Sequence, residues 1–349
     1  MKLRSKMGSI AVEDKQHTQL PVIDLSPFLQ SSSDQERLHS AEELVKACKE
    51  IGFCFIKGHG VPQDKIQEAF AVSKKFYALP QEEKMKAPHP PGWAVHRGYS
   101  WPGLEKVSNA VSENDAKDEA DKLREVQDFK ESYEVGSEDN PDMPNVWPPD
   151  EVLPEWRPCM TAFYWTCWEA AQNILKALAL GLGIEEKLMM EPHSGHHNQL
   201  RLLHYPPIRA SELQGGKFAR MPAHTDWTTI TMLFQDDCGG LQVESPTQRG
   251  TFIDADPVPD TLVLNVGDLL MRWSNDYLKS TQHRVQPPPL EDRYEGEQRM
   301  TRARYSIPYF VTTDPDVTIE CLRLQDGRPP QYEPITQRDY SDMRARMQY

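Results

Sequence analysis

The stretch Ala223-His224-Thr225-Asp226-Trp227 runs directly into an alternating β-branched segment, Thr228–Phe234. It reads His-x-Asp at the expected start of a strand. Side chains alternate across a strand, so residues i and i+2 point to the same face. We therefore expect His224 and Asp226 to lie side by side, and His283, in Thr281–Val285, to reach them from a separate strand.

These three side chains form a candidate metal site. Two neutral imidazoles and one carboxylate are the ligand set of the facial triad that holds non-haem Fe(II) and leaves coordination positions open. Each residue also has a structural alternative: either histidine could be hydrogen-bonded within a sheet, and Asp226 could cap a turn. The combination of His224, Asp226 and His283 favours a metal site.

The sequence around this motif predicts a mainly β fold. After Asn198, short strands alternate with Gly- and Pro-containing turns, which is typical of a sandwich or barrel, and a jelly roll is the closed two-sheet solution. The expected strands are Leu200–Tyr205, Thr229–Phe234, Leu241–Glu244, Thr251–Ile253, Leu262–Val266, Leu269–Trp273, Thr281–Gln286, Ala303–Val311 and Val317–Glu320.

The N-terminal half has a different rhythm. Strands and helices alternate over about the first 80 residues, with strands at Leu20–Leu25 and Phe53–Ile56 and helices at Ala41–Ile51 and Gln63–Tyr77. Further on, the apolar segment Pro154–Gly183 predicts a long helix behind a sheet. We expect a flexible N-terminus (1–19), an α/β region (20–190) with an irregular acidic loop (87–150), a β core (191–321) and a C-terminal tail (322–349).

Composition disfavours several classes of partner. A net charge of −14 disfavours nucleic acid and anionic membranes, because phosphate binding needs clustered Lys and Arg. No apolar run reaches the roughly 18 residues of a membrane span. The six cysteines form no Cys-x-x-Cys pair, which favours reduced thiols and a cytoplasmic location.

A second polar pair lies downstream in the strand Ala303–Val311. Arg304 and Ser306 share one face, and Tyr305, Ile307 and Tyr309 take the other. A buried guanidinium beside a hydroxyl is a good carboxylate receptor, because its planar fork binds both oxygens. Tyr205 could add a donor, and Arg302, on the same strand face, could share the role.

The ordered motifs of the chain resemble the 2-oxoglutarate/Fe(II)-dependent dioxygenases of the isopenicillin N synthase-like group, including fungal thymine hydroxylase-like and natural-product tailoring oxygenases. The motifs extend from about residue 20 to 320. They are Pro21–Leu25, Ile51–Val61, Phe76–Pro80, Leu202–Pro207, His224-Thr225-Asp226, Gly239–Val243, Asn265–Asp268, His283–Val285 and Arg304–Phe310. Two features depart from the family pattern: the charged insert 287–300, interpreted as an enlarged hairpin, and Leu203, where many relatives carry Asn.

The resemblance implies a double-stranded β-helix (jelly-roll) core backed by long helices. It implies Fe(II) at His224, Asp226 and His283, with O2 and 2-oxoglutarate as cosubstrates and the distal carboxylate of 2-oxoglutarate at Arg304 and Ser306, assisted by Tyr205. The implied reaction is oxidation of a C–H bond of a small organic molecule by hydroxylation, desaturation or cyclisation, as in secondary metabolism.

Two other functions remain open at this point. One is an iron oxidase of the same fold that uses O2 without 2-oxoglutarate, and the other is a non-catalytic jelly-roll binding protein. For an enzyme, the candidate substrate contacts are Tyr99, Trp227 and Phe310. We expect a small-molecule substrate and a monomer or homodimer.

Overall fold

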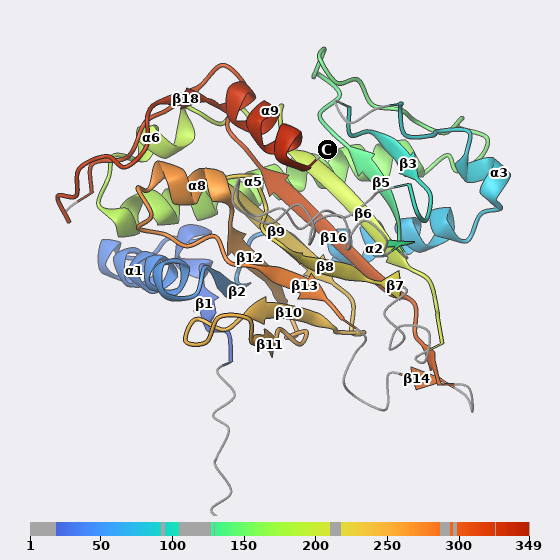
Figure 1. Cartoon of the computed structure of the whole chain (residues 1–349), viewed down its shortest axis with the longest axis horizontal. Coiled ribbons are helices and arrows are strands. Elements are labelled where there is room, and N and C mark those ends of the chain that lie inside the picture. The colour runs from blue at the N-terminus through green and yellow to red at the C-terminus, as the bar shows by residue number, and fades with distance from the viewer. Residues whose placement is uncertain are drawn as a thin grey trace, which may run out of the picture.

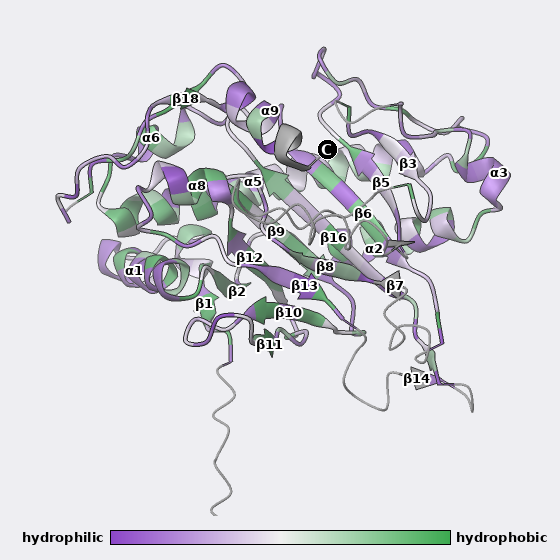
Figure 2. Ribbon diagram, in the orientation of Figure 1, coloured by the Kyte–Doolittle hydropathy of each residue, from purple (hydrophilic) through white to green (hydrophobic). Residues whose placement is uncertain are grey.

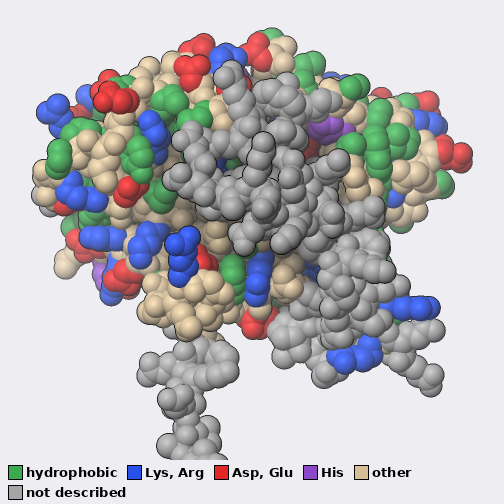
Figure 3. All heavy atoms as spheres, viewed as in Figure 1, with side chains coloured by type: hydrophobic (Ala, Val, Ile, Leu, Met, Phe, Trp, Pro, Cys, Tyr) green, Lys and Arg blue, Asp and Glu red, His purple; other side chains and the backbone are tan. Residues whose placement is uncertain are grey.

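The computed structural model describes residues 19–91, 95–104, 127–128, 130–209, 218–286, 294–295, 299–324 and 326–348. The predictions for residues 1–18, and those for parts of the acidic loop and of the insert 287–300, lie outside the described residues. No helix in the described ranges combines the length and apolarity needed to span a bilayer. Acidic and basic side chains lie intermingled on the described surface seen in Figure 3.

Two sheets form the centre of the molecule (Figure 1). The larger has the order β1-β2-β12-β9-β16-β6-β5-β3, and the smaller β11-β10-β13-β8. The strands of the larger sheet are Val22–Asp24 (β1), Phe53–Lys57 (β2), Thr261–Val266 (β12), Ile230–Gln235 (β9), Arg304–Val311 (β16), Gln199–Tyr205 (β6), Glu131–Val135 (β5) and Gly98–Ser100 (β3). Those of the smaller are Phe252–Asp254 (β11), Leu241–Glu244 (β10), His283–Val285 (β13) and Met221–His224 (β8).

The predicted two-sheet jelly roll is confirmed. One apolar core lies between the sheets and joins Leu203, Tyr205 and Val263 of the larger sheet to Val243 and Val285 of the smaller. Figure 2 shows the hydrophobic residues along β10, in contrast to the hydrophilic surface helix α3 (Gln81–Lys84). The larger sheet takes strands from before and after residue 190, so the N-terminal region and the β core share one sheet.

Three helices cover the outer face of the larger sheet: α1 (Asp34–Glu50), α2 (Gln63–Tyr77) and α5 (Trp156–Leu182) (Figure 1). The long helix α5 confirms the predicted backing helix, and its end at Gly183 is set by a left-handed φ of 68°. The remaining short elements are η1 (Ser26–Phe28), α6 (Glu186–Met190), α8 (Asp268–Trp273), α9 (Gln337–Gln348), β4 (Gln127–Asp128), β7 (Phe218–Ala219), β14 (Tyr294–Glu295), β15 (Met300–Thr301), β17 (Thr318–Ile319) and β18 (Ile335–Thr336). Strands β14 and β15 pair antiparallel, in agreement with the predicted hairpin in the insert.

The prediction of a strand at Leu269–Trp273 is wrong, because this segment is helix α8. Gly267 occupies the N-cap position and Asp268 lies in the first turn, where its charge suits the helix dipole. Leu269 and Trp273 are both buried and stand one helical turn apart. A short apolar run does not by itself distinguish a strand from one turn of buried helix.

The loop 87–150 is also more regular than predicted. It contributes β5 and β3, which extend the larger sheet beyond β6. Every residue of both strands is buried. Burial on both faces removes the polar–apolar alternation that identifies a strand, and polar residues such as Ser132 and Glu134 occupy buried positions here.

One buried histidine makes stability depend on pH. His193 hydrogen-bonds the Met189 carbonyl through Nδ1 (2.7 Å) and Thr229 Oγ1 through Nε2 (2.9 Å). Burial lowers its pKa from 6.5 to about 4. The unfolded chain binds this proton near pH 6.5 and the native chain does not, so native stability is lost as pH falls from about 6.5 to about 4.

We therefore expect His193→Gln to flatten the pH dependence of the unfolding free energy between pH 6.5 and 4. Between pH 6.5 and pH 4, the unfolding free energy of wild type should fall by up to about 3 kcal/mol more than that of His193→Gln. Urea unfolding at a series of pH values measures it. His39→Gln is the control, because His39 is exposed. Parallel curves for wild type and His193→Gln would contradict the assignment.

Candidate active site

The two candidate histidine ligands face one another across a strand pair. His224 ends β8, His283 begins β13, and the antiparallel register places them directly opposite. Their ring centroids are 4.2 Å apart. Asp226 lies past the end of β8, in the turn before β9. The prediction that His224 and Asp226 share a strand face is therefore wrong; the turn, rather than strand alternation, brings the carboxylate back toward the rings.

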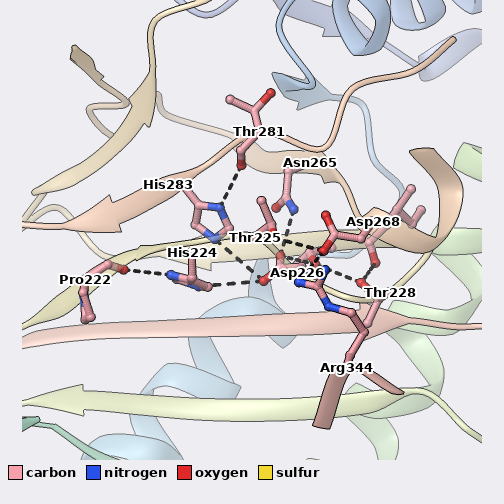
Figure 4. Close-up of polar contacts among 12 residues, drawn as sticks. Pro222, His224, Thr225, Asp226, Thr228, Asn265, Asp268, Thr281, His283 and Arg344 are labelled. Carbon is pink, nitrogen blue, oxygen red and sulfur yellow. Dashed lines mark hydrogen bonds and ion pairs between the residues drawn. The ribbon is translucent and has the colours of Figure 1, made fainter. Parts of the chain in front are cut away.

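The backbone orients both imidazoles (Figure 4). Nδ1 of His224 lies 2.9 Å from the Pro222 carbonyl and Nδ1 of His283 lies 3.3 Å from the Thr281 carbonyl. A carbonyl only accepts, so each Nδ1 carries the proton and each Nε2 keeps its lone pair. The Nε2 atoms of His224 and His283 point to Asp226 Oδ1 at 3.9 and 3.7 Å.

The Asp226 carboxylate is held by its other oxygen. Oδ2 accepts hydrogen bonds from Thr231 Oγ1 at 2.6 Å and from Asn265 Nδ2 at 2.8 Å. Oδ1 therefore faces the two histidines (Figure 4). Hydrogen bonds of this kind fix the orientation of a metal-binding carboxylate and tune its basicity. Sequence reasoning did not assign this role to Thr231 or Asn265, because nothing in either motif shows which residue each side chain reaches.

The protonation states suit a metal. Burial, with the charge of His283 next, lowers the pKa of His224 to about 4, so the ring is neutral at pH 7. Burial alone would raise the pKa of Asp226, but His283, His224 and the hydrogen bonds from Thr231 and Asn265 hold it below its usual value. The three ligand atoms lie within 4.8 Å of one another. Neutral imidazoles and an ionised carboxylate are the forms that bind a divalent ion, so these residues fit Fe(II).

The candidate carboxylate receptor lies on β16. Arg304 is 1% exposed. Its Nε donates to the Gly239 carbonyl (3.1 Å), its Nη1 donates to Ser306 Oγ (3.0 Å), and it lies over the Tyr205 ring, 5.2 Å from the centroid. Among the described residues, no carboxylate lies within salt-bridge distance of Arg304. A buried cation is costly without a counter-charge, so this position fits a carboxylate ligand.

Comparison with known proteins agrees with this geometry. The family model "non-haem dioxygenase in morphine synthesis N-terminal" matches residues 20–150, and the "2OG-Fe(II) oxygenase superfamily" model matches residues 196–313. A 2-oxoglutarate-Fe(II) type oxidoreductase of Metarhizium rileyi is 35% identical over 88% of this chain and 85% of its own. The chain belongs to the 2-oxoglutarate- and Fe(II)-dependent oxygenases.

Further relatives of this oxygenase are similar over nearly their whole length. A proline hydroxylase of Petromyces alliaceus is 35% identical over 94% of this chain and 98% of its own. The crystal structure of a full-length Neurospora crassa protein in complex with alpha-KG and thymine matches with a TM-score of 0.81 and 35% identity, covering 96% of this chain and 99% of that one. The oxygenase therefore uses Fe(II), 2-oxoglutarate and O2, and the alternatives of a 2-oxoglutarate-independent oxidase and of a non-catalytic binding protein are not supported.

The structure adds one cation to the receptor region of this oxygenase and excludes another. Arg220, just before β8, is 1% exposed and lies over the same Tyr205 ring, 5.8 Å from its centroid. The sequence did not predict this position for Arg220, because a single arginine before the His-x-Asp motif forms no recognisable pattern with other residues. Arg302 instead forms an ion pair with Asp237 at 2.7 Å, and both side chains are about one-third exposed or more. Arg302 therefore does not share the role of Arg304.

The candidate substrate residues take three different positions. Phe310 is half-buried and shares the β16 face of Arg304 and Ser306. Trp227 directly follows Asp226 and packs at the rim of the main core. Tyr99 is fully buried and donates to Glu131, on the face covered by helix α2, so its position does not favour the predicted substrate contact.

The C-terminal helix contacts the surroundings of the triad. Arg344 of α9 forms an ion pair with Asp268 at 2.8 Å and lies over the Trp227 ring, 5.6 Å from the centroid. Asp268 in turn accepts from Thr225 Oγ1, and its backbone N–H donates to the Asp226 carbonyl. Figure 4 shows Arg344 beside this group. The tail 322–349 thus includes a helix anchored next to the candidate ligand Asp226.

The hydrogen bonds to Asp226 lead to a prediction. Thr231→Val keeps the shape of the side chain and removes one donor to Oδ2. We expect the Kd for Fe(II) to rise about tenfold to hundredfold, because the carboxylate loses part of its fixed orientation. Anaerobic Fe(II) titration measures this.

The matched control is Thr261→Val, whose hydroxyl donates only to the Val258 carbonyl among the described residues. Its Kd should equal that of wild type. Equal Fe(II) affinity in Thr231→Val and wild type would show that this hydrogen bond does not position the ligand.

Proposed function

We propose that His224, Asp226 and His283 hold the catalytic iron, and that Arg304 and Ser306, with Tyr205, bind the distal carboxylate of 2-oxoglutarate. The observation that carries the proposal is the convergence of two Nε2 atoms and Asp226 Oδ1, with the outer atoms of all three side chains held by hydrogen bonds. Buried Arg304, which has no carboxylate within salt-bridge distance among the described residues, supports the second part.

The residues around the proposed iron site would have the following roles. Pro222 and Thr281 keep the imidazoles in the tautomer that binds metal, and Thr231 and Asn265 orient the carboxylate. When bound, Fe(II) with 2-oxoglutarate reduces O2, forms succinate and CO2, and oxidises a substrate C–H bond. The apolar core between the sheets lies beside this region, where Phe53 packs against the His283 ring.

The substrate is proposed to be a small organic molecule of secondary metabolism, as the fungal relatives suggest. The Neurospora crassa relative, at 35% identity, binds thymine. Trp227 and Phe310, beside Asp226 and on the Arg304 face respectively, are the proposed substrate contacts. Hydroxylation, desaturation and cyclisation all start from the same C–H oxidation, and the position of the substrate selects among them.

The side chains also bear on the cellular location and the oligomeric state of the enzyme. All six cysteines are free thiols, which supports a cytoplasmic location. Every proposed ligand comes from one chain, so a monomer would be sufficient and a homodimer would serve equally. The segments 20–190, 191–321 and 322–349 are proposed as the accessory, catalytic and C-terminal parts of the enzyme.

The iron assignment is tested by His224→Ala. We expect loss of stoichiometric Fe(II) binding and loss of 2-oxoglutarate decarboxylation, because the two ligands that remain, Asp226 and His283, hold the ion only weakly. Metal titration and succinate release are the measurements. The control His39→Ala removes an exposed histidine and should behave as wild type. Wild-type turnover in His224→Ala would refute the metal site.

The receptor assignment is tested by Arg304→Met. We expect the KM for 2-oxoglutarate to rise about tenfold to hundredfold, because a charged hydrogen-bonding partner is lost, while Fe(II) affinity stays unchanged. Arg302→Met is the matched control on the same segment and should leave KM unchanged. The opposite pattern, with KM affected only by Arg302→Met, would move the receptor to that residue.

A further inference from the structure

A second buried arginine lies next to the proposed 2-oxoglutarate receptor. Arg220 and Arg304 are each 1% exposed, and both lie over the ring of Tyr205, with their guanidinium carbons 5.8 and 5.2 Å from the ring centroid. Arg304 belongs to β16 of the larger sheet, whereas Arg220 directly precedes β8 of the smaller sheet (Figure 1). The proposed function gives Arg220 no role, although a buried cation is costly to keep in a folded protein.

The same two segments of the chain contact both guanidinium groups. Arg220 donates through Nη2 to the Arg302 carbonyl at 3.0 Å, and its Nη1 lies 3.9 Å from the Cys238 sulfur. Arg304, two residues after Arg302, donates through Nε to the Gly239 carbonyl at 3.1 Å. Gly239 directly follows Cys238 in the chain. The two side chains therefore lie close together beside the start of β16, one contributed from each sheet.

The positive charges in this region outnumber the negative ones. Arg220 and Arg304 are buried, and among the described residues no carboxylate lies within salt-bridge distance of either. The carboxylate of Asp236 accepts hydrogen bonds from the backbone N–H groups of Tyr305 at 2.7 Å and Cys238 at 3.0 Å. Burial raises the pKa of Asp236, and the charge of Arg304 opposes that rise. Two cations and this one acid leave at least one positive charge unbalanced, which a bound carboxylate would neutralise.

Both guanidinium groups also have unused hydrogen-bond donors. Nε of Arg220 is buried and has no hydrogen-bond partner in the described part of the chain. Its Nη1 reaches only the Cys238 sulfur, and a thiol is a weak acceptor. Within the same residues, Arg304 donates only through Nε and Nη1. Buried N–H groups are nearly always hydrogen-bonded, so the remaining donors of both side chains favour a ligand rich in acceptors.

The closeness of the two cations is itself unfavourable. Burial lowers the pKa of Arg220, the Cys238 thiol opposes this change, and the charge of Arg304 adds to it. A guanidinium nevertheless stays protonated in a protein, so the repulsion is not relieved by the loss of a proton. An anion bound to both groups would relieve it.

Building on the proposed function, we propose that Arg220 is a second cation of the 2-oxoglutarate receptor and binds the distal carboxylate together with Arg304. Arg304 and Ser306 hold the carboxylate from the larger sheet, and Arg220 holds it from the side of the smaller sheet. A carboxylate has two oxygens and several lone pairs, so it accepts from both guanidinium groups at once. Arg220 thereby selects for cosubstrates that carry a negative charge at the distal end.

A purely structural role for Arg220 is the alternative. Its hydrogen bond to the Arg302 carbonyl joins the segment before β8 to the segment before β16. The two roles differ in their dependence on the ligand. A structural role alters the affinity of every 2-oxo acid to the same extent, whereas a receptor role alters only the affinity for a charged distal group.

The test uses the full chain loaded anaerobically with Fe(II) and two 2-oxo acids that differ at the distal end. They are 2-oxoglutarate and 5-methyl-2-oxohexanoate, in which an isopropyl group replaces the distal carboxylate. Calorimetry measures both Kd values, by competition where a ligand binds weakly. In Arg220→Met the Kd for 2-oxoglutarate should rise about tenfold to hundredfold, because a charged hydrogen-bonding partner is lost. The Kd for 5-methyl-2-oxohexanoate should hardly change, so the preference for the charged ligand should fall by the same factor.

A second variant keeps the test decisive if Arg220→Met folds poorly. In Arg304→Met, Arg220 still donates to the distal carboxylate, so the preference for 2-oxoglutarate should fall but persist. Arg302→Met is the matched control, because the Arg302 side chain pairs with Asp237 and its backbone carbonyl stays in place. Both Kd values of this control should equal those of wild type.

Three results would overturn the role of Arg220: an unchanged Kd for 2-oxoglutarate in Arg220→Met, an equal rise of both Kd values in that variant, or complete loss of the preference in Arg304→Met. Failure of the proposed function would look different. Wild type would then bind no Fe(II), or Arg304→Met would keep the full wild-type preference for 2-oxoglutarate.

Discussion

The geometry of the proposed iron site in this oxygenase depends on the Asp226 carboxylate, whose two oxygens have different partners. One oxygen is held by Thr231 of β9 and Asn265 of β12, and the other faces His224 and His283. The first two residues belong to the larger sheet and the histidines to the smaller. The carboxylate thus links the two sheets, and a change in their separation would alter the geometry of the proposed iron site. This explains why a buried charge is tolerated here: it is surrounded by donors on one side and by metal-binding nitrogens on the other.

The larger sheet separates two environments. Its outer face carries α1, α2 and α5 and the main apolar core. Its inner face holds polar groups at intervals along neighbouring strands: Arg304 and Ser306 on β16, Arg201 on β6 and Glu134 on β5. Because strands alternate, one sequence of residues can serve stability and chemistry at the same time. The same segments that build the core therefore also position the proposed binding groups.

Several elements were predictable because their signals are local. The long helix α5 follows from its apolar periodicity, and the Arg304–Ser306 pair follows from alternation within a single strand, which the structure confirms. Other elements had no local signal. Leu269–Trp273 is too short for its period to be recognised, and β3 and β5 are buried on both faces, so their pattern resembles that of an irregular loop. The position of Asp226 after the end of β8 likewise has no local signal, because the alternating sequence after it favours an earlier start of strand β9.

The sequence by itself determined the family, the jelly-roll class and the identity of the candidate ligands, because ligand chemistry belongs to residue types and their order along the chain. Only the tertiary structure decided that Thr231 and Asn265 orient Asp226. It also decided that Arg220, and not Arg302, lies beside Arg304. Finally, it decided that Tyr99 faces away from the proposed iron site, whereas Glu134 and Arg201 face the smaller sheet. The physical reason is that these relations are contacts between strands distant in sequence. Their partners are set by register and burial, which no single segment specifies.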